Sequence, residues 1–486
     1  MLGTYADRRV KIVATLGPAV AGRDTVRELL EAGVDVARIN AAHGTSDDRA
    51  RLIEDVRAAS QDLGRLVPVL FDLQGLKIRT GKLESGDPVP VARGSMVEVV
   101  PEAVPTSAGR IGVGYDRLLD VIQPGSRLLI SDGLIELLVE RIGNGVATCI
   151  VGRGGLLNSR QGVTLPGAPI RGGALTETDR GDVAFAVGQG VDYLGLSFVN
   201  EASDLVLARG TAGAYGSQTP GLIAKIERPE ALANVRDIAS QADGVMVARG
   251  DLGVQLPPER VPRAQKEIIG VANQLGLPVI TATQMLESMI TQPVATRAET
   301  SDVANAVWDG TDAVMLSAET AMGRYPVEAV QTMDRIIREA EKDGPIRSES
   351  AAKPLPGTSR DAGLAFADAI ARAAYALSDQ TPTGHIVVFT LAGSAARRIA
   401  KYRPQPPIIA VATDEAVARR LNLVWGVRAL TVPIEEDPDK MFREAGKAII
   451  DAGLATPDEY ALIVGSLPML RVSGRTNLVH FRRLGT

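Results

Sequence analysis

The amino-acid sequence predicts an α/β protein with a (β/α)₈ TIM barrel, a small β-barrel domain inserted into it, and a C-terminal open α/β domain. Short β-rich runs alternate with amphipathic helical stretches through most of the first 343 residues, which is the pattern of parallel βα units. Residues 81–172 interrupt this pattern with alternating runs rich in Val, Gly and Pro. The length of 486 residues also exceeds what one hydrophobic core organises.

Eight short runs have the composition of barrel strands. They are Lys11–Thr15, Val34–Asn40, Val67–Asp72, Tyr193–Val199, Gly221–Glu227, Gly244–Gly250, Pro278–Thr283 and Ala313–Ser317. Between most of them lie helical patterns, at Thr25–Ala32, Asp47–Leu63, Thr176–Gly188, Pro229–Ala239, Arg263–Leu275, Ala298–Trp308 and Pro326–Ala340. We expect residues 1–80 and 173–343 to form the barrel, because together they approach the ~250 residues typical of that fold.

The remaining segments are predicted as separate units. The insertion at 81–172 carries the strand patterns Met96–Val100, Arg127–Ile130, Ile135–Val139 and Ala147–Val151. Residues 344–357 are rich in Pro and Gly and are predicted to be a linker. Residues 358–486 alternate helices with the strands Ile386–Thr390, Ile408–Thr413, Val427–Val432 and Tyr460–Val464, which predicts a separate open α/β domain.

Composition excludes several classes of protein. The net charge of −5 argues against a nucleic-acid-binding protein. The single cysteine, Cys149, excludes an internal disulfide framework and indicates a reducing compartment. No apolar stretch approaches the roughly 18 residues of a membrane span, and no apolar signal core precedes the barrel. We therefore expect a cytoplasmic protein that binds neither nucleic acid nor membrane.

An unusual pair of charges lies at the end of the fifth predicted strand. Lys225 and Glu227 are two residues apart within an apolar run, so on a strand they point to the same face. Burying a cation and a carboxylate is costly unless they are paired, bound to a metal or acting on a charged ligand. This placement indicates phosphate and divalent-metal chemistry.

Polar side chains also follow other predicted strands, at Arg38–Asn40, Asp72, Arg249–Gly253, Thr281–Gln284 and Ser317–Thr320. Taken singly, each is more often a cap or a turn. Together they favour an active site, since catalytic groups of such barrels gather at the carboxyl ends of the strands. Glu227 and Asp251 form the natural metal pair, and carboxylates without histidine or cysteine select Mg²⁺ or Mn²⁺. Three basic residues, Arg38, Arg79 and Lys225, would then face phosphate oxygens, although Arg79 could instead lie on the surface.

In this order, these residues closely resemble the pyruvate kinase family. The matching stretches are Lys11–Pro18, Ala37–Asn40 with His43-Gly44, Ile78–Gly81, Gly162–Gly167, Ile223–Glu227, Val247–Val254, Thr281–Met289, Thr296–Ala306 and Asp309–Thr320, followed by Gly323 and Tyr325-Pro326. The run Thr283–Met289 is highly specific to this family. The resemblance covers the barrel, the insertion and, less sharply, the C-terminal region.

The resemblance implies transfer of the phosphoryl group of phosphoenolpyruvate to ADP, giving ATP and pyruvate. By the same resemblance, Lys225 stabilises the transferring group, while Glu227 and Asp251 hold Mg²⁺ or Mn²⁺. Thr283 assists protonation of the enolpyruvate, and the backbone of Gly250 and Asp251 receives the substrate carboxylate.

The family also implies a nucleotide side to the site, a moving lid and an assembly. Asn40, His43 and Arg79 line the nucleotide phosphates, and Arg38 contacts both substrates, so that Arg38 and Arg79 also serve catalysis. The inserted domain closes over the site and excludes water. The implied assembly is a homotetramer.

One group of departures concerns the monovalent cation that typical family members bind. In those members a serine, a threonine and the equivalents of Asn40 and Asp72 ligate K⁺, and a glutamate accompanies K⁺ dependence. This chain has Ala42 and Leu73 in place of the two hydroxyl residues, and Lys77 in place of the glutamate. An ammonium group can substitute for a monovalent cation. We therefore expect activity independent of K⁺, with a solvated Lys77 as the alternative.

Two further departures affect the nucleotide. Asn200-Glu201 replaces an Arg-Lys pair whose lysine is associated with nucleotide phosphates, and Ile170-Arg171 lies where the lid often carries an aspartate. The preference among nucleoside diphosphates therefore does not carry over from the family. In the C-terminal region, Thr390, Gly393 and Ser394 lie where the family's effector-phosphate loop runs, but Ala392 and Ala395 replace two hydroxyl residues. An ordinary strand–turn–helix is an equally good interpretation of this loop.

Two other functions use the same residues. A metal-dependent barrel lyase or aldolase acting on pyruvate enolates would need the same metal pair and lysine. A catalytically silent phosphoenolpyruvate-binding regulator would explain Glu201 and Arg171. The phosphate-facing arginines oppose the first alternative, and Lys225, Glu227, Asp251 and Thr283 oppose the second.

Overall fold

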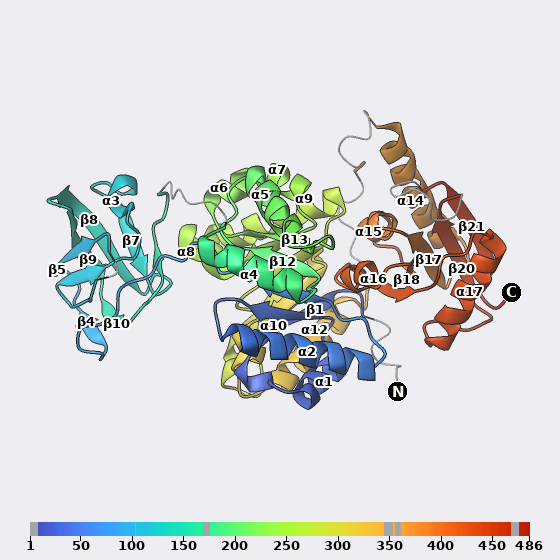
Figure 1. Ribbon diagram of the computed structural model, residues 1–486, viewed down its shortest axis with the longest axis horizontal. Coiled ribbons are helices and arrows are strands. Elements are labelled where there is room, and N and C mark those ends of the chain that lie inside the picture. Colours follow the sequence, from blue (N-terminus) through green and yellow to red (C-terminus); the bar gives the residue numbers. More distant parts are fainter. Residues whose placement is uncertain (1–7, 103, 169–174, 345–352, 355–360, 468–475) are drawn as a thin grey trace.

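The protein consists of three units arranged in a row along its long axis (Figure 1). The computed structural model describes residues 8–102, 104–168, 175–344, 353–354, 361–467 and 476–486. A β-rich unit lies at one end, the barrel occupies the middle, and the C-terminal α/β unit lies at the other end. The barrel therefore has a separate neighbour on each side.

The eight predicted barrel strands all form, and they close into a ring in the order β1-β16-β15-β14-β13-β12-β3-β2. Every pairing in the ring is parallel. The strands are β1 (Lys11–Leu16), β2 (Val36–Asn40), β3 (Val69–Asp72), β12 (Tyr193–Leu196), β13 (Gly221–Ile226), β14 (Gly244–Ala248), β15 (Val279–Ala282) and β16 (Ala313–Leu316). Their residues are almost all buried, as expected of a sheet covered on both faces.

The helices of the barrel begin at clear sequence signals. Reciprocal capping boxes open three of them, from Thr45, Thr176 and Thr296, and a proline opens the last one at Pro326. The helices are α1 (Arg23–Ala32), α2 (Ser46–Asp62), α4 (Glu177–Gly188), α5 (Ala202–Gly213), α6 (Pro229–Ala233), α7 (Val235–Gln241), α8 (Arg249–Gln255), α9 (Val261–Leu275), α10 (Arg297–Trp308), α11 (Ala318–Ala321) and α12 (Pro326–Ala340).

One helical prediction needs correction. The stretch Pro229–Ala239 is not continuous, because Asn234 leaves helical geometry with φ −99° and ψ 10° and separates α6 from α7. In addition, α5 forms between β12 and β13, where the sequence interpretation proposed no helix.

The inserted unit is made of short strands and one short helix. Its main sheet has the order β11-β7-β8-β9-β5-β6, and a second sheet pairs β10 with β4. The elements are β4 (Val89–Val91), β5 (Met96–Val100), β6 (Arg110–Gly112), α3 (Leu118–Val121), β7 (Arg127–Ile130), β8 (Ile135–Gly143), β9 (Val146–Arg153), β10 (Gly155–Leu157) and β11 (Val163–Thr164). Cys149 is buried in its core, where free cysteines are commonly found.

The C-terminal unit is an open sheet with the order β19-β18-β17-β20-β21, in which only β21 is antiparallel to its neighbour. Its elements are α14 (Ala362–Gln380), β17 (His385–Thr390), α15 (Ser394–Lys401), β18 (Ile408–Ala412), α16 (Glu415–Leu421), β19 (Val427–Thr431), α17 (Pro438–Asp451), β20 (Tyr460–Gly465) and β21 (Leu478–Arg483). Apart from residues 344, 353 and 354, the predicted linker lies outside the described residues. None of the helices described is both long and apolar enough for a membrane span.

The C-terminal unit seals the amino end of the barrel. Leu423 is fully buried and belongs to the same core cluster as the residues that fill the barrel interior. Next to it, the Lys11 ammonium donates a hydrogen bond of 2.7 Å to the carbonyl of Val427. Burial lowers the pKa of Lys11 to about 8, so the side chain remains charged at neutral pH.

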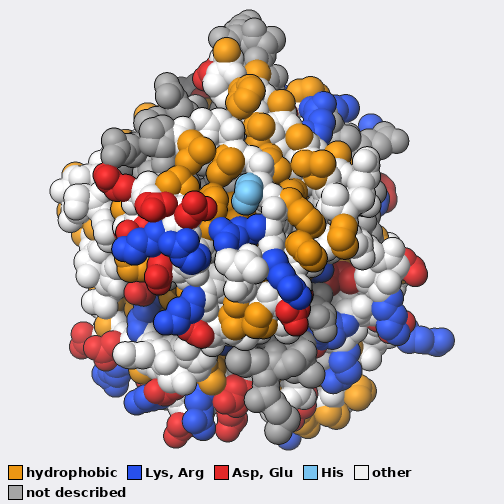
Figure 2. Space-filling view, turned by 90° about the vertical axis from the view of Figure 1, so that its right-hand side faces the viewer, with side chains coloured by type: hydrophobic (Ala, Val, Ile, Leu, Met, Phe, Trp, Pro, Cys, Tyr) orange, Lys and Arg blue, Asp and Glu red, His pale blue; other side chains and the backbone are white. Residues whose placement is uncertain are grey.

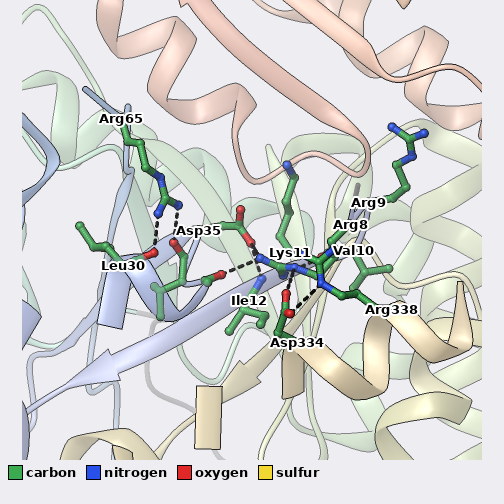
Figure 3. A network of polar contacts seen from close by, with 12 residues as sticks. Arg8, Arg9, Val10, Lys11, Ile12, Leu30, Asp35, Arg65, Asp334 and Arg338 are labelled. Carbon is green, nitrogen blue, oxygen red and sulfur yellow. Dashed lines mark hydrogen bonds and ion pairs between the residues drawn. The ribbon is translucent and has the colours of Figure 1, made fainter. Parts of the chain in front are cut away.

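A network of charges surrounds this seal (Figure 3). Arg8 pairs with Asp35 at 2.8 Å and with Asp334 at 3.0 Å, and Asp35 also accepts the backbone N–H of Ile12 at 2.8 Å. Asp35 lies in the connection between α1 and β2, and Asp334 belongs to α12, so the network ties the first barrel strand to its neighbouring elements. The buried carboxylate balances both Arg8 and the nearby Lys11 ammonium.

We expect Asp35→Asn to destabilise the protein by about 3–5 kcal/mol, because it leaves buried cations with one carboxylate fewer. Thermal unfolding measures this as a lower melting temperature. Asp451→Asn, an exposed position at the end of α17, is the control and should leave the melting temperature nearly unchanged. Equal melting temperatures of Asp35→Asn and the wild type would contradict the assigned role.

Candidate active site

The carboxyl ends of the barrel strands bring the predicted charged residues into contact. Lys225, near the end of β13, places its ammonium 2.9 Å from Glu227 Oε1 and 3.2 Å from Asp72 Oδ1. The Lys225 and Glu227 side chains therefore do lie on one face, as their spacing predicts. Asp72 comes from β3, so the cluster joins strands that are far apart in the sequence.

Lys225 is held as a permanent cation. Its side chain is 11% exposed, and burial alone would lower its pKa. The carboxylates of Asp72, Glu227 and Asp251 outweigh that effect and raise the pKa of Lys225 above its ordinary value. The ammonium also donates a 2.6 Å hydrogen bond to Ser197 Oγ. A side chain so firmly protonated suits charge stabilisation rather than proton donation.

Asp72 is fully buried and is shared by two cations. Arg38 donates to its Oδ2 from Nε at 2.8 Å and from Nη2 at 2.6 Å, while Lys225 approaches its Oδ1. Burial opposes ionisation, but the two cations prevail and hold the pKa of Asp72 below its usual range. Arg38 also donates from Nη1 to Thr15 Oγ1 at 2.8 Å. These three bonds leave two of the five guanidinium N–H groups of Arg38 for a ligand.

Glu227 and Asp251 fit a divalent cation. Both line one cleft between the barrel and the inserted unit, and the charge of Asp251 contributes to raising the pKa of Glu227, after the larger effect of burial. Glu227 Oε2 accepts the backbone N–H of Phe198 at 2.9 Å, which fixes the orientation of the carboxylate. Two neighbouring carboxylates, one buried and one exposed, form an oxygen donor set for Mg²⁺ or Mn²⁺ that leaves positions for substrate oxygens.

Thr283 lies in a strained turn after β15. Its φ is +68° and that of Gln284 is +56°, both in the left-handed region that non-glycine residues rarely adopt. The Thr283 hydroxyl accepts the Gly250 N–H at 2.8 Å and donates to the carbonyl of Ala282 at 2.6 Å. Arg249 supports the turn by donating to the Thr283 carbonyl at 2.6 Å and pairing with Asp302 at 2.7 Å. Thr283 and Gly250 are thus adjacent, as the proposed substrate site requires.

The predicted nucleotide residues form a basic wall beside the cluster. The His43 side chain is exposed, and partial desolvation together with the charges of Lys77, Arg79 and Arg38 lowers its pKa. These three cations therefore lie close to the imidazole and keep it neutral at pH 7. Asn40 lies opposite Asp72 in the register of β2 and β3, and its Oδ1 accepts the Ala42 N–H at 3.1 Å.

Lys77 and Arg79 belong to the chain that connects the barrel to the inserted unit. Arg79 forms an isolated bridge with Gly162, and its guanidinium donates to the carbonyl of Arg160 at 3.1 Å. Lys77 is exposed and lines the same cleft as Glu227 and Asp251. In the described part of the chain, the ion pairs of Asp72 go to Arg38 and Lys225, and none goes to Lys77.

The structure shows the surroundings of some of the residues at which this sequence departs from the family pattern. Glu201 precedes α5, and its backbone N–H donates to Asp204 at 3.1 Å. Ile170 and Arg171 lie outside the described residues. In the C-terminal unit, buried Thr390 accepts the N–H of Gly393, which has a φ of +84° and precedes Ser394 at the start of α15. The Thr390 hydroxyl is therefore used within a strand–turn–helix.

A parallel (β/α)₈ barrel with a charged cluster at the carboxyl ends of its strands defines a TIM-barrel enzyme. Two family models match the chain, "Pyruvate kinase, barrel domain" over residues 7–330 and "Pyruvate kinase, alpha/beta domain" over residues 368–481. The chain belongs to the pyruvate kinase family. Its reaction is the transfer of the phosphoryl group of phosphoenolpyruvate to ADP.

Similar proteins agree over nearly the whole length. A pyruvate kinase of Agrobacterium vitis is 43% identical over 473 residues, which cover 97% of this chain and 96% of that protein. One of Mycobacterium tuberculosis is 41% identical, covering 98% and 99% respectively. The crystal structure of a pyruvate kinase from Cryptosporidium parvum matches with a TM-score of 0.88 at 32% identity, covering 98% of this chain and 96% of the other. These matches support a kinase over a lyase, an aldolase or a silent regulator.

Sequence reasoning missed two residues of the cluster. Ser197 follows β12, accepts from Lys225 and donates to the carbonyl of Leu73 at 2.7 Å. Its position after a barrel strand is the same signal that identified the other strand ends. Phe198 has a φ of +55° and presents its N–H to Glu227. No sequence signal predicts that conformation, because phenylalanine rarely adopts it.

We expect Ser197→Ala to lower kcat roughly tenfold, because a net loss of about 1–3 kcal/mol at a buried charged hydrogen bond lets Lys225 leave its position. Steady-state kinetics measures the effect. Ser60→Ala removes a hydroxyl of similar burial that bonds only within α2, and it should retain wild-type kcat. Wild-type kcat in Ser197→Ala would show that Asp72 and Glu227 alone position the lysine.

Proposed function

We propose that the cluster around Lys225 is the site of phosphoryl transfer. The observation that carries this proposal is the buried ammonium of Lys225, held by Asp72 and Glu227 in the cleft that Asp251 also lines. An ADP oxygen attacks the phosphorus of phosphoenolpyruvate, and the bond from phosphorus to the enol oxygen breaks. The bonding electrons pass to that oxygen, and the resulting enolate takes a proton at its carbon to give pyruvate.

In this proposal each residue of the cluster has one task. Lys225 offsets the charge on the transferring phosphoryl oxygens, and its preorganised position requires no rearrangement during the reaction. Glu227 and Asp251 hold Mg²⁺ or Mn²⁺, which when bound neutralises phosphoryl and enolate oxygens. Thr283 orients the water that protonates the enolate, and the backbone of Gly250 and Asp251 receives the substrate carboxylate.

The basic wall serves the nucleotide. Arg38 offers its two remaining N–H groups, and Arg79, Asn40 and His43 face the phosphates of ADP. A neutral His43 donates or accepts a hydrogen bond there without adding charge. Residues 81–172 close over the cleft as a lid, with the connection around Arg79 and Gly162 as the hinge.

We further propose that Lys77 replaces the monovalent cation. The charge of Lys77 acts on His43 together with those of Arg38 and Arg79, so its ammonium lies near the segment that follows Asn40. An additional K⁺ at this place would meet three cations. Activity is therefore expected without K⁺.

The C-terminal unit supports assembly into a homotetramer. The edge strand β21 exposes Phe481, which stacks on exposed Tyr460 of β20 with ring centroids 5.0 Å apart. Figure 2 shows hydrophobic side chains gathered on this face of the molecule. Among the described residues no strand pairs with the outer edge of β21, and such an edge with exposed aromatic side chains is normally covered by a partner, here a second copy of the chain. The molar mass of the protein in solution tests this assembly, and a monomer would refute it.

We expect Lys225→Met to reduce kcat by at least a thousandfold with little change in ADP affinity, because only the transferring group depends on the ammonium. A coupled assay with phosphoenolpyruvate, ADP and Mg²⁺ measures kcat, and calorimetry measures ADP binding. Circular dichroism verifies that the variant is folded. Turnover close to wild type in the folded variant would refute the assigned role.

We expect the wild-type enzyme to be fully active in buffer free of K⁺ and Na⁺. Lys77→Glu should lose most of this activity and regain part of it when K⁺ is added, because a carboxylate then needs a cation. Lys447→Glu, an exposed charge reversal on α17, is the control and should behave as wild type. Strong stimulation of the wild type by K⁺ would overturn the proposal.

A further inference from the structure

Arg228, the residue after Glu227, is buried without a partner for its charge. It is 7% exposed, and its Nε has no hydrogen-bond partner. Within the described chain, its guanidinium makes no hydrogen bond or ion pair, and its contact is the ring of Phe198, 4.8 Å from the guanidinium carbon to the ring centroid. An arginine in this state is unusual, because burying an uncompensated cation is costly.

The carboxylates near Arg228 are those of Glu227, Glu230 and Asp204. Glu227 binds Lys225 with one oxygen and the Phe198 N–H with the other. Asp204 accepts the N–H groups of Asn200 and Glu201. Neither these two carboxylates nor that of exposed Glu230 forms an ion pair with the Arg228 guanidinium in the described part of the chain. The protein alone therefore leaves this cation unbalanced.

Arg228 lies where substrates enter. It lines the cleft between the barrel and the inserted unit, together with Lys77, Asp132, Phe198, Glu227 and Asp251. Tyr115 of the inserted unit is close enough to influence its charge. We therefore expect the partner of the Arg228 guanidinium to be a ligand that binds in the cleft. Both substrates that enter the cleft carry negatively charged phosphate groups.

Position within the cleft favours one of the two substrates. Glu227 stands between the ammonium of Lys225 and the backbone of Phe198, and Arg228 stacks on the ring of Phe198. Arg228 lines the same cleft as Lys77, and Lys77 lies near His43 and Arg79 on the proposed nucleotide side of the site. A phosphate at Arg228 belongs to the second substrate, the nucleotide.

We propose that Arg228 is a binding residue for a phosphate of ADP, held ready by its stacking on Phe198. The inference rests on the proposed phosphoryl-transfer site, because it takes Lys225 as the place of the transferred group. A planar guanidinium binds phosphate oxygens in pairs, and its fixed orientation reduces the entropy lost on binding. In the free protein the buried charge of Arg228 is destabilising. The phosphate of the bound nucleotide would balance that charge and remove the destabilisation.

The test compares Arg228→Met, which keeps an apolar side chain against Phe198, with Arg228→Lys, which keeps the charge. Calorimetry with full-length enzyme, Mg²⁺ and ADP is expected to give a Kd at least tenfold higher for Arg228→Met and an intermediate value for Arg228→Lys. The KM for ADP should rise in parallel, and the KM for phosphoenolpyruvate should change less than twofold. Arg236→Met, which removes an exposed arginine from α7, is the control and should bind ADP normally.

Thermal stability separates binding from a structural role. Removing a buried, unpartnered cation should leave the melting temperature of Arg228→Met equal or higher. Wild-type ADP affinity, or a lower melting temperature with equal rises in both KM values, would overturn the proposal. Failure of the phosphoryl-transfer site would appear differently, as normal turnover in Lys225→Met.

Discussion

The active site depends on one buried carboxylate. Asp72 is ionised at the centre of the barrel mouth because Arg38 and Lys225 both bind it, and each cation is in turn oriented by that contact. The backbone leaves just enough room for it, since a Cβ at Gly195 would lie 2.8 Å from Asp72 Oδ1. Without this carboxylate, two buried cations would repel each other, and Lys225 would keep only Glu227 and Ser197 as partners.

Local sequence patterns predicted most of the architecture, because the side chains of strands and helices repeat their direction within a few residues. A spacing of two residues placed Lys225 and Glu227 on one face, and the 2.9 Å contact between them confirms this. Alternation of strand and helix patterns predicted the eight barrel strands, and all eight form. The metal and nucleotide roles of the site residues stay predictions, because their tests need ligands.

What the sequence could not show depends on contacts between distant strands and on rare backbone conformations. The pairing of Asp72 with Lys225 joins residues 153 positions apart and requires β3 and β13 to lie on the two sides of β12. Phe198 and Thr283 adopt positive φ values, which their residue types do not suggest. Such strain persists only where surrounding contacts enforce it, here the bonds to Glu227, Gly250 and Arg249.

The seal at the amino end of the barrel has a consequence for engineering. Leu423 fills the barrel interior, and Tyr193 and Asp192 bind Arg420 and Arg419 of the C-terminal unit. Deleting that unit would open a hydrophobic cavity on the side of the barrel opposite the active site. It would also leave polar groups that are now buried there without their partners. A minimal catalytic barrel cannot therefore be obtained by truncation alone: its floor would have to be redesigned with new apolar side chains.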